Sequence, residues 1–323
     1  MTARRFFRIT LRSIGLLLAA ASLLIVLGWA IGWIASDRWI WTQWLSWMPS
    51  LVLVAAGILL VVAWPLAFGR RGWPGGLALI LIGPMIFLGQ NWRPARVPHD
   101  SSVGITITHW TLGSVLSNED SYANALLDTG SELNIIEGGR KIRWTRTIKD
   151  WLGAEHTSPS TGIFSVITRL PMSRLQHLIW ADGIHVAKLD VHGPGFVDRP
   201  LRILLVDLPS DPGRSRWEIA AQCRHLLDQK DCGEFDLVIG DFNMPSDSRA
   251  LGTLFPGYES GWRQSGEGWG PTYPREWPLA RIDHVLTGPM VAVKRLRTFD
   301  PGLGRHCLQT MTIIPKPEKS SDR

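Results

Sequence analysis

The stretch Phe235-Asp236-Leu237-Val238-Ile239-Gly240-Asp241-Phe242-Asn243 decides how this chain is interpreted. Its apolar run has the length and the aliphatic content of a buried strand. A short turn after such a strand presents the side chains of Asp241 and Asn243 together at the rim of a sheet. There a carboxylate can accept a proton or orient a water molecule, and a carboxamide can donate to a phosphate oxygen. The stretch therefore indicates phosphoester hydrolysis.

Strand-like runs alternate with helical patterns in the chain that follows residue 98. Apolar runs predict strands near residues 163–167, 184–191, 201–206, 235–239 and 282–286. The spacing of apolar residues predicts helices over Asn118 to Gly130 and over Arg216 to Asp228. A segment of about 220 residues is long enough to bury one sizeable core. The local pattern therefore predicts a single domain of mixed α and β structure.

Seven blocks, taken in order, carry a resemblance to a known family. They are Ile105–Thr111, Leu133–Glu137, Thr161–Pro171, Arg202–Pro209, Gly240–Asn243, Arg281–Leu286 and Gly304–His306. With these blocks the chain from about Val103 to about Pro315 resembles the endonuclease/exonuclease/phosphatase superfamily, the deoxyribonuclease I-like metal-dependent phosphoesterases. The resemblance implies a four-layer α/β sandwich, in which two mixed sheets pack face to face and helices flank them.

The resemblance implies a role for each residue that matches the family's motifs. Glu137 would bind Mg²⁺ or Mn²⁺. Asp241 would orient or deprotonate the attacking water, and Asn243 would hold that water or a phosphate oxygen. His306 would stabilise the charge that develops on the phosphoryl group or protonate a leaving oxygen. Asp283 would orient His306 or contact the metal.

Three positions depart from the family's pattern. In the family the first strand usually ends in Asn, but this chain has Thr111 there. Asp207 replaces the family's mid-chain catalytic His, and Arg305 replaces the Asp of its final Ser-Asp-His motif. Thr111 keeps a hydroxyl that can bond a phosphate oxygen. Arg305 cannot replace an oxygen ligand of a hard cation. We expect Arg305 to pair with Asp207 instead, and to take over part of the stabilisation of phosphate charge.

Two further features adjoin the matching blocks. The Gly- and aromatic-rich stretch Gly266–Pro274 precedes the Asp283 strand. In the resembled family a loop here borders the active site and often carries such a Thr. The stretch therefore either shapes substrate choice or forms a turn-rich surface loop. For His109 and His284 a structural role, or one that supports the site residues, is favoured.

The distribution of charge separates two parts of the chain. The 323 residues carry a net charge of +6. Residues 1–98 hold nine Arg and one Asp, a net charge of +8, and the remainder holds 25 basic and 27 acidic residues, a net charge of −2. Proteins that bind duplex nucleic acid normally present a cationic surface that releases counterions from the phosphates. The charge therefore disfavours a duplex nuclease, and extracytoplasmic nucleic acid, phospholipid head groups and small phosphate esters stay open as substrates.

Residues 1–92 read as a membrane anchor, so the lipid bilayer is one expected partner; no protein partner can be inferred. Three apolar runs, at 13–35, 49–68 and 75–90, are predicted to cross a bilayer, which needs about 20 residues. The link between the first two runs is rich in Trp, as is typical of an aromatic belt.

The cations around these runs predict the orientation of the chain in the membrane. Four Arg precede the first run, and Arg70 and Arg71 separate the second run from the third. The positive-inside rule then places the N-terminus in the cytoplasm. With three spans the following domain lies outside the cytoplasmic membrane, and with two spans it would be cytoplasmic. We expect three spans, and therefore a multi-pass protein of the inner membrane with its domain outside.

The remaining segments complete the predicted organisation. Residues 93–102 are predicted to be a linker, 103–315 the phosphoesterase-like domain and 316–323 a flexible tail. Cys223 and Cys232 either form a disulfide or remain thiols, and Cys307 is left over in both cases. Because three family positions are changed, two functions stay open: a metal-dependent phosphoesterase, or a catalytically impaired relative that acts as a binding or scaffold protein.

Overall fold

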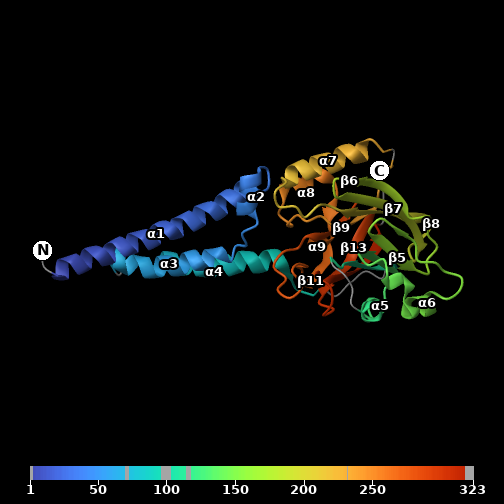
Figure 1. Cartoon of the computed structure of the whole chain (residues 1–323), viewed down its shortest axis with the longest axis horizontal. Coiled ribbons are helices and arrows are strands. Elements are labelled where there is room, and N and C mark those ends of the chain that lie inside the picture. Colours follow the sequence, from blue (N-terminus) through green and yellow to red (C-terminus); the bar gives the residue numbers. More distant parts are fainter. Residues whose placement is uncertain (1–2, 70–72, 96–102, 114–117, 231, 317–323) are drawn as a thin grey trace, which may run out of the picture. The chain divides into compact units, whose positions relative to one another are not determined.

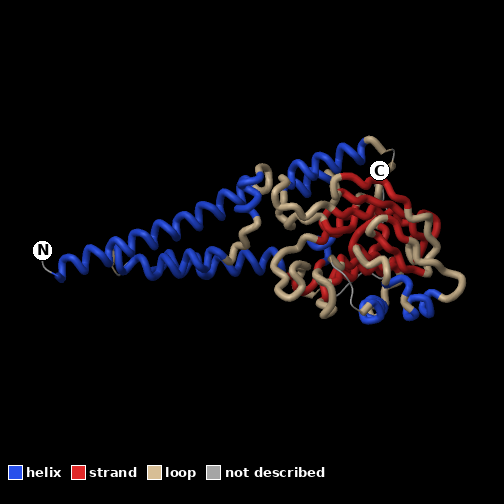
Figure 2. Tube along the Cα trace, viewed as in Figure 1, coloured by secondary structure: helices blue, strands red, loops and turns tan. Residues whose placement is uncertain are grey.

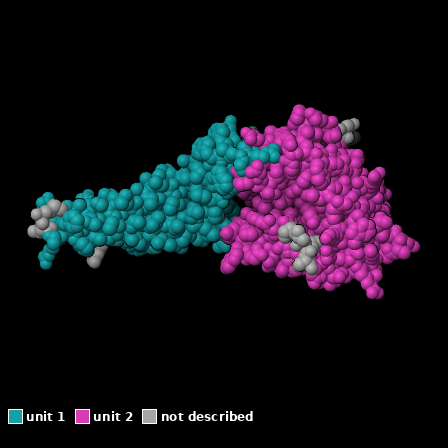
Figure 3. Space-filling model, in the orientation of Figure 1, with its two compact units in different colours: residues 1–91, 213–217, 247–250 teal, residues 92–212, 218–246, 251–323 magenta. Residues whose placement is uncertain are grey.

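The computed structural model describes residues 3–69, 73–95, 103–113, 118–230 and 232–316. The chain divides into two compact units, shown in different colours in Figure 3. The first unit comprises residues 1–91 with 213–217 and 247–250, and the second comprises the rest. All the strands of the described residues, red in Figure 2, belong to the second unit.

The first unit contains four successive helices, α1 (Ala3–Ala35), α2 (Ile40–Ser46), α3 (Val52–Ala67) and α4 (Trp73–Asn91). Helix α3 packs against both α1 and α4. Across these contacts Ser22 Oγ donates to the Ala56 carbonyl at 2.8 Å, and Ser50 Oγ donates to the Gly83 carbonyl at 2.9 Å. By length and composition α1 and α4 could each cross a membrane, whereas α3 is a shorter apolar helix. Helices of this kind are weak evidence for a membrane segment, because buried core helices and signal sequences share their properties.

The second unit is built on two mixed sheets (Figure 1). The eight-stranded sheet has the order β1-β11-β13-β14-β2-β3-β5-β4, and the six-stranded sheet has the order β10-β12-β9-β8-β7-β6. The strands are β1 (Trp92–Arg93), β2 (Ile105–Thr111), β3 (Leu133–Glu137), β4 (Ser160–Thr161), β5 (Phe164–Thr168), β6 (Gln176–Ala181), β7 (Ile184–Gly193), β8 (Phe196–Asp207), β9 (Leu237–Asp241), β10 (Glu259–Ser260), β11 (Gly266–Trp269), β12 (Asp283–Thr287), β13 (Val291–Phe299) and β14 (Leu308–Pro315). The predicted α/β sandwich of two mixed sheets is confirmed.

Helices flank the sheets. They are α5 (Glu119–Leu127), the short 3-10 helix η1 (Ile142–Trp144), α6 (Arg146–Leu152), α7 (Arg216–Asp228), α8 (Arg249–Leu254) and α9 (Gly261–Ser265). Asn118 begins α5 by accepting from the Ser121 backbone N–H at 3.3 Å, which satisfies one of the unpaired donors of the first turn. Helices α5 and α6 cover the eight-stranded sheet through a buried cluster that includes Trp110, Leu126 and Ile148.

The main core lies between the two sheets. Its buried residues include Ile107 and Ile135 of one sheet and Ile203 and Leu205 of the other. Side chains alternate between the faces of a strand, so Leu204 projects from the opposite face of β8. It too is fully buried, as is expected for a strand covered on both sides. The long apolar runs of the sequence follow from this double burial.

Gly240 sets the distance between the two parallel strands that end at the site. Its φ is +156°, and a Cβ built there would lie 1.7 Å from the Val206 carbonyl oxygen. Any side chain at this position would push β9 away from β8. The glycine therefore lets Asp241 and Asp207, the last residues of the two strands, lie side by side as register partners.

The edges of the predicted domain differ in detail from the sequence-based boundaries. Trp92 and Arg93 form β1 and pair with Trp269 and Gly268 of β11, so the sheet begins before residue 103. Residues 96–102 of the expected linker and 317–323 of the expected tail lie outside the described residues. All three cysteines are described, and none is in a disulfide.

Candidate active site

One row of residues crosses the six-stranded sheet at its rim. Successive register partners are Trp180 on β6, His185 on β7, Asp207 on β8, Asp241 on β9 and Asp283 on β12. Register partners on neighbouring strands project from the same face, with the strands about 4.8 Å apart. The row therefore places three carboxylates beside one another, with a histidine and then a tryptophan at one end.

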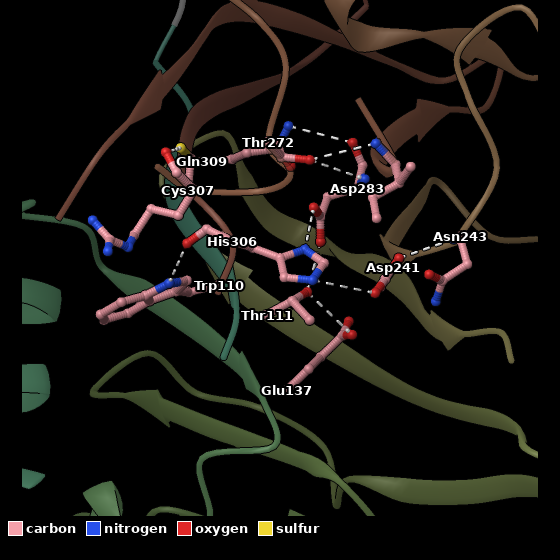
Figure 4. A network of polar contacts seen from close by, with 12 residues as sticks. Trp110, Thr111, Glu137, Asp241, Asn243, Thr272, Asp283, His306, Cys307 and Gln309 are labelled. Carbon is pink, nitrogen blue, oxygen red and sulfur yellow. Dashed lines mark hydrogen bonds and ion pairs between the residues drawn. The ribbon is translucent and has the colours of Figure 1, made fainter. Parts of the chain in front are cut away.

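The eight-stranded sheet supplies the opposite side of the site. Thr111 and Glu137 end the parallel strands β2 and β3 as register partners, and His306 lies just before β14. Figure 4 shows Glu137, Thr111 and Asp241 gathered around the His306 ring. A pocket of about 320 Å³ opens here, lined by Thr111, Gly113, Glu137, Gly138, Ile163, Asp207, Leu208, Pro209, Ser210, Asp241, Asn243, Tyr273, Arg305 and His306. The structure therefore brings together the residues that the sequence singled out.

His306 is held between two carboxylates. Its Nδ1 lies 2.8 Å from Asp283 Oδ2, and its Nε2 lies 3.9 Å from Asp241 Oδ2. Burial alone would lower the pKa of His306, but the charge and hydrogen bond of Asp283 raise it to about 9. Burial alone would raise the pKa of Asp283, but His306 outweighs it and holds that pKa below its usual range. The two residues therefore form a buried imidazolium–carboxylate pair.

We expect His306→Gln to lower the free energy of unfolding by about 3 kcal/mol near pH 6, because it leaves the Asp283 carboxylate buried without its partner. The pKa of His306 is raised, so its contribution is complete below its ordinary value of 6.5 and is lost as the pH rises through about 9. The pKa of Asp283 is lowered, so its contribution disappears only below its ordinary value of 3.8. The difference in the free energy of unfolding between wild type and His306→Gln should thus shrink from pH 7 to pH 10. Urea unfolding in EDTA measures it.

His284 provides the matched control for this experiment. It is also buried, but its Nε2 lies 2.8 Å from the Met244 carbonyl oxygen and its pKa is lowered to about 4, mainly by burial. Its imidazole is therefore neutral from pH 7 to pH 10. The loss of stability in His284→Gln should therefore be constant over that interval. If the loss of stability in His306→Gln were also independent of pH, it would contradict the ion pair.

Glu137 is buried against His109 and Thr111. Its Oε1 lies 2.8 Å from His109 Nε2, and Thr111 Oγ1 lies 3.4 Å from its Oε2 and 2.6 Å from Asp283 Oδ1. Burial raises the pKa of Glu137 well above its usual value, and nearby carboxylates add to that shift. The Thr111 hydroxyl has one proton and so can donate to only one of its two carboxylates. This arrangement favours a cation beside Glu137.

Asp241 and Asn243 form the turn that the sequence predicts at the end of β9. The Asn243 backbone N–H donates to Asp241 Oδ1 at 2.9 Å, and Asn243 Nδ2 donates to the Leu208 carbonyl at 2.8 Å. Asn243 has a φ of +50°, a left-handed conformation that Asn tolerates better than most residues. The pKa of Asp241 is raised well above its usual value, first by burial and then by the charge of Asp283. The turn holds the amide at the pocket and directs Asp241 Oδ2 toward His306.

The carboxylates of this cluster fit a divalent cation. Oxygen atoms of Asp241 and Asp283 lie within 4.8 Å of each other and of a His306 ring nitrogen, and Thr111 connects Asp283 to Glu137. Carboxylate oxygens are the ligands that Mg²⁺ and Mn²⁺ prefer. A cation would also offset the repulsion that raises the pKa values of Glu137 and Asp241.

The expected ion pair between Asp207 and Arg305 is wrong. Among the ion pairs of the described residues, Asp207 Oδ2 accepts from His185 Nδ1 at 2.9 Å. Arg305 Nη2 instead donates to Tyr273 Oη at 3.2 Å, and its guanidinium lies 5.9 Å from that ring. His185 reaches Asp207 because the two are in register on adjacent strands. Both Asp207 and Arg305 nevertheless line the pocket.

The stretch Gly266–Pro274 begins as strand β11 and reaches the site at Tyr273. Thr272 Oγ1 accepts weakly from the backbone N–H of Asp283 at 3.4 Å, and Tyr273 lines the pocket with its ring 4.9 Å from that of His306. His185 was not predicted as a site residue from the sequence, and Tyr273 was predicted only as part of the stretch Gly266–Pro274. His185 lies inside a predicted strand, and its alternation with apolar neighbours was the only signal that could have placed it on the inward face.

The model of the Endonuclease/Exonuclease/phosphatase family matches residues 133–322 of this chain. A search among curated proteins gives no match. Among solved structures, the chain is similar to a mannosyl-6-phosphatase from Bacteroides thetaiotaomicron, with 10% identity, a TM-score of 0.49, and coverage of 65% of this chain and 99% of that one.

Two further structures are similar at the same level. An endonuclease/exonuclease/phosphatase from Beutenbergia cavernae has 14% identity and a TM-score of 0.49, over 65% of this chain and 71% of that one. A 3′ phosphatase from Neisseria, bound to a product DNA hairpin, has 15% identity and a TM-score of 0.45, over 64% of this chain and 98% of that one.

Proposed function

Because the chain belongs to the endonuclease/exonuclease/phosphatase family, we propose that it is a divalent-metal-dependent phosphoesterase. The family acts on phosphoesters by hydrolysis. One observation carries the proposal for this chain. Glu137, Asp241 and His306, which are distant in the sequence, line one pocket, and Asp283 lies behind it, bonded to His306 (Figure 4).

The acidic residues have two proposed tasks. Glu137 and Asp283 would hold Mg²⁺ or Mn²⁺, and the Thr111 hydroxyl lies between their carboxylates. Such a cation would supply positive charge to the phosphate oxygens. Asp241 accepts a proton from the attacking water at Oδ2. Since that atom lies 3.9 Å from His306 Nε2, one oxygen atom can lie within hydrogen-bonding distance of both.

The polar groups on the other side of the pocket bind the phosphoryl group. His306, protonated because its pKa is about 9, donates from Nε2 to the charge that develops in the transition state. Asn243 donates its second amide N–H to the water or to a phosphate oxygen. Arg305, on the pocket wall, supplies positive charge where the family has a carboxylate.

We also propose that residues 1–91 anchor the protein in the cytoplasmic membrane. Three apolar helices, α1, α3 and α4, support this, and α1 and α4 have the length to span a bilayer. With Arg4, Arg5, Arg8 and Arg12 on the cytoplasmic side, three spans put the sheet domain outside the cytoplasm.

A screen of the full-length protein in detergent tests the enzymatic proposal. We expect slow or absent hydrolysis of bis-p-nitrophenyl phosphate in EDTA and its restoration by Mg²⁺ or Mn²⁺, with p-nitrophenyl phosphate and a phospholipid as parallel substrates. The release of p-nitrophenol or of phosphate is the measurement. If no cation restores hydrolysis and calorimetry detects no cation binding, the chain is instead an impaired family member that acts as a binding protein.

A further inference from the structure

Trp180 is a large side chain that the proposed chemistry does not use. It stands at the end of the row that continues through His185 and Asp207 to Asp241. Three strand spacings separate its Cα from that of Asp241, a distance of about 15 Å. Its side chain is 56% exposed. The row thus carries an accessible aromatic ring at one end and the acids of the candidate active site at the other.

Two contacts fix the Trp180 ring beside the pocket. Its centroid lies 4.3 Å from that of His185, with the planes inclined by 44°. Its edge lies against Gly162, where a Cβ would come 2.2 Å from ring atom Cζ3. Gly162 also has a φ of +56°, so a side chain there would be strained and would displace the ring. The residue after Gly162, Ile163, lines the pocket, so the ring lies against the segment that leads into the pocket wall.

Three polar atoms of residues that neighbour Trp180 in the chain or in the sheet already have hydrogen-bond partners. His185 Nδ1 bonds Asp207, and His177 Nε2 lies 2.8 Å from the Ile179 carbonyl oxygen. Asp182 Oδ2 accepts from Gln222 Nε2 at 2.7 Å. Recognition of a sugar by its hydroxyls needs free hydrogen-bonding groups, whereas a planar ring needs an exposed aromatic face. The large exposed group here is the aromatic side chain of Trp180.

We propose that Trp180, supported by His185, is a stacking platform for a nucleobase-like ring carried by the ester substituent of the substrate. This inference rests on the proposed phosphoesterase function and names its substrate class. A single ring platform binds one unstacked base. The net charge of −2 after residue 98 supports the same choice, because a duplex would require a cationic surface. The substrate is therefore a nucleotide ester or the end of a single strand.

Equilibrium binding to the full-length protein in detergent with Mg²⁺ tests the platform. The probes are thymidine 5′-monophosphate, thymidine 3′-monophosphate and ribose 5-phosphate, which has the sugar and phosphate but no base. We expect wild type to bind the tighter thymidine nucleotide about 10-fold more strongly than ribose 5-phosphate, in line with stacking of one base on an aromatic ring. Trp180→Ala should abolish the difference, and Trp180→Phe should retain most of it.

Trp144→Ala is the matched control, since Trp144 is 60% exposed but lines a different pocket. It should leave all the affinities unchanged. Equal affinities for the nucleotides and ribose 5-phosphate in wild type, or an unchanged preference in Trp180→Ala, would overturn the platform. An equal loss for all three ligands in Trp180→Ala would also overturn it, because it indicates binding of the sugar.

Thymidine itself, which has no phosphate, separates this proposal from the proposed function. Saturation-transfer NMR should detect contact of its base protons with wild type but not with Trp180→Ala. If that contact is present while the phosphate adds nothing to the affinity and ribose 5-phosphate does not bind, the platform stands and the phosphoesterase proposal fails. If phosphate ligands bind with no preference for a base, the phosphoesterase proposal stands and the platform fails.

Discussion

Asp241→Asn is expected to lower kcat for phosphoester hydrolysis by about 10³-fold, within the roughly 10² to 10⁴ that a general base contributes. The Asn side chain has the same shape and can still accept the Asn243 N–H at Oδ1, so the turn is retained. Its amide nitrogen, however, cannot take a proton from water. Steady-state kinetics with bis-p-nitrophenyl phosphate in saturating Mg²⁺ measure the effect.

Asp236→Asn is the matched control, because Asp236 is another buried aspartate close to the same strand. It lies just before β9, and its carboxylate accepts from Arg199 and from the Arg202 backbone N–H. Its replacement should reduce stability and leave kcat within about twofold, since it is not at the pocket. An Asp241→Asn protein that kept a tenth of the wild-type kcat would remove Asp241 from the role of base.

Glu137→Gln is expected to weaken the binding of the activating cation by about 100-fold or more, because it removes a charged oxygen ligand. Loss of a residue that merely supports a ligand already costs about 10- to 100-fold. The pKa of Asp241 is raised first by burial and also by nearby carboxylates, Glu137 among them; removing the Glu137 charge relieves part of that repulsion, so the fold should be retained. Calorimetric titration with Mn²⁺ and the Mg²⁺ dependence of the rate measure the change.

Glu267→Gln serves as the comparison for Glu137→Gln. Glu267 is also buried, but its Oε2 accepts from Arg295 and Arg297 on β13. Its loss should lower stability and leave cation affinity unchanged. If both glutamine variants bind Mn²⁺ as tightly as wild type, the cation is held elsewhere.

The local sequence predicted five strands of the domain, because their signals are local. The apolar runs near 163–167, 184–191, 201–206, 235–239 and 282–286 are β5, β7, β8, β9 and β12, and the predicted helix Arg216–Asp228 is also confirmed. Glu137, Asp241, Asn243 and His306 line one pocket, and Asp283 bonds His306. That convergence followed from the family resemblance and not from periodicity, since no local pattern gives the distance between residues on different sheets.

The partners of the changed residues could not be predicted from the sequence. Asp207 and Arg305 carry opposite charges, and charge alone suggested a pair. The structure instead pairs Asp207 with His185, because strand register brings them together, and turns Arg305 toward Tyr273. Register depends on how whole strands align, and a shift of one residue would reverse every side chain. The short strands β4, β10 and β11 were missed for a related reason: with two to four residues each, they have no detectable period.

The register of the six-stranded sheet also bears on how this chain can change its chemistry over evolution. The strand register places His185, Asp207 and Asp241 next to one another. These backbone positions stay adjacent even when their side chains are replaced. Histidine and aspartate codons differ by one base. Point mutations can therefore replace a histidine on one strand and introduce one at the adjacent position of the next strand. An insertion of one residue within a strand would instead shift its register and turn apolar core side chains away from the core. Lineages of this fold should therefore diverge by exchanging residues along the rim and by lengthening loops, while the strands keep their lengths.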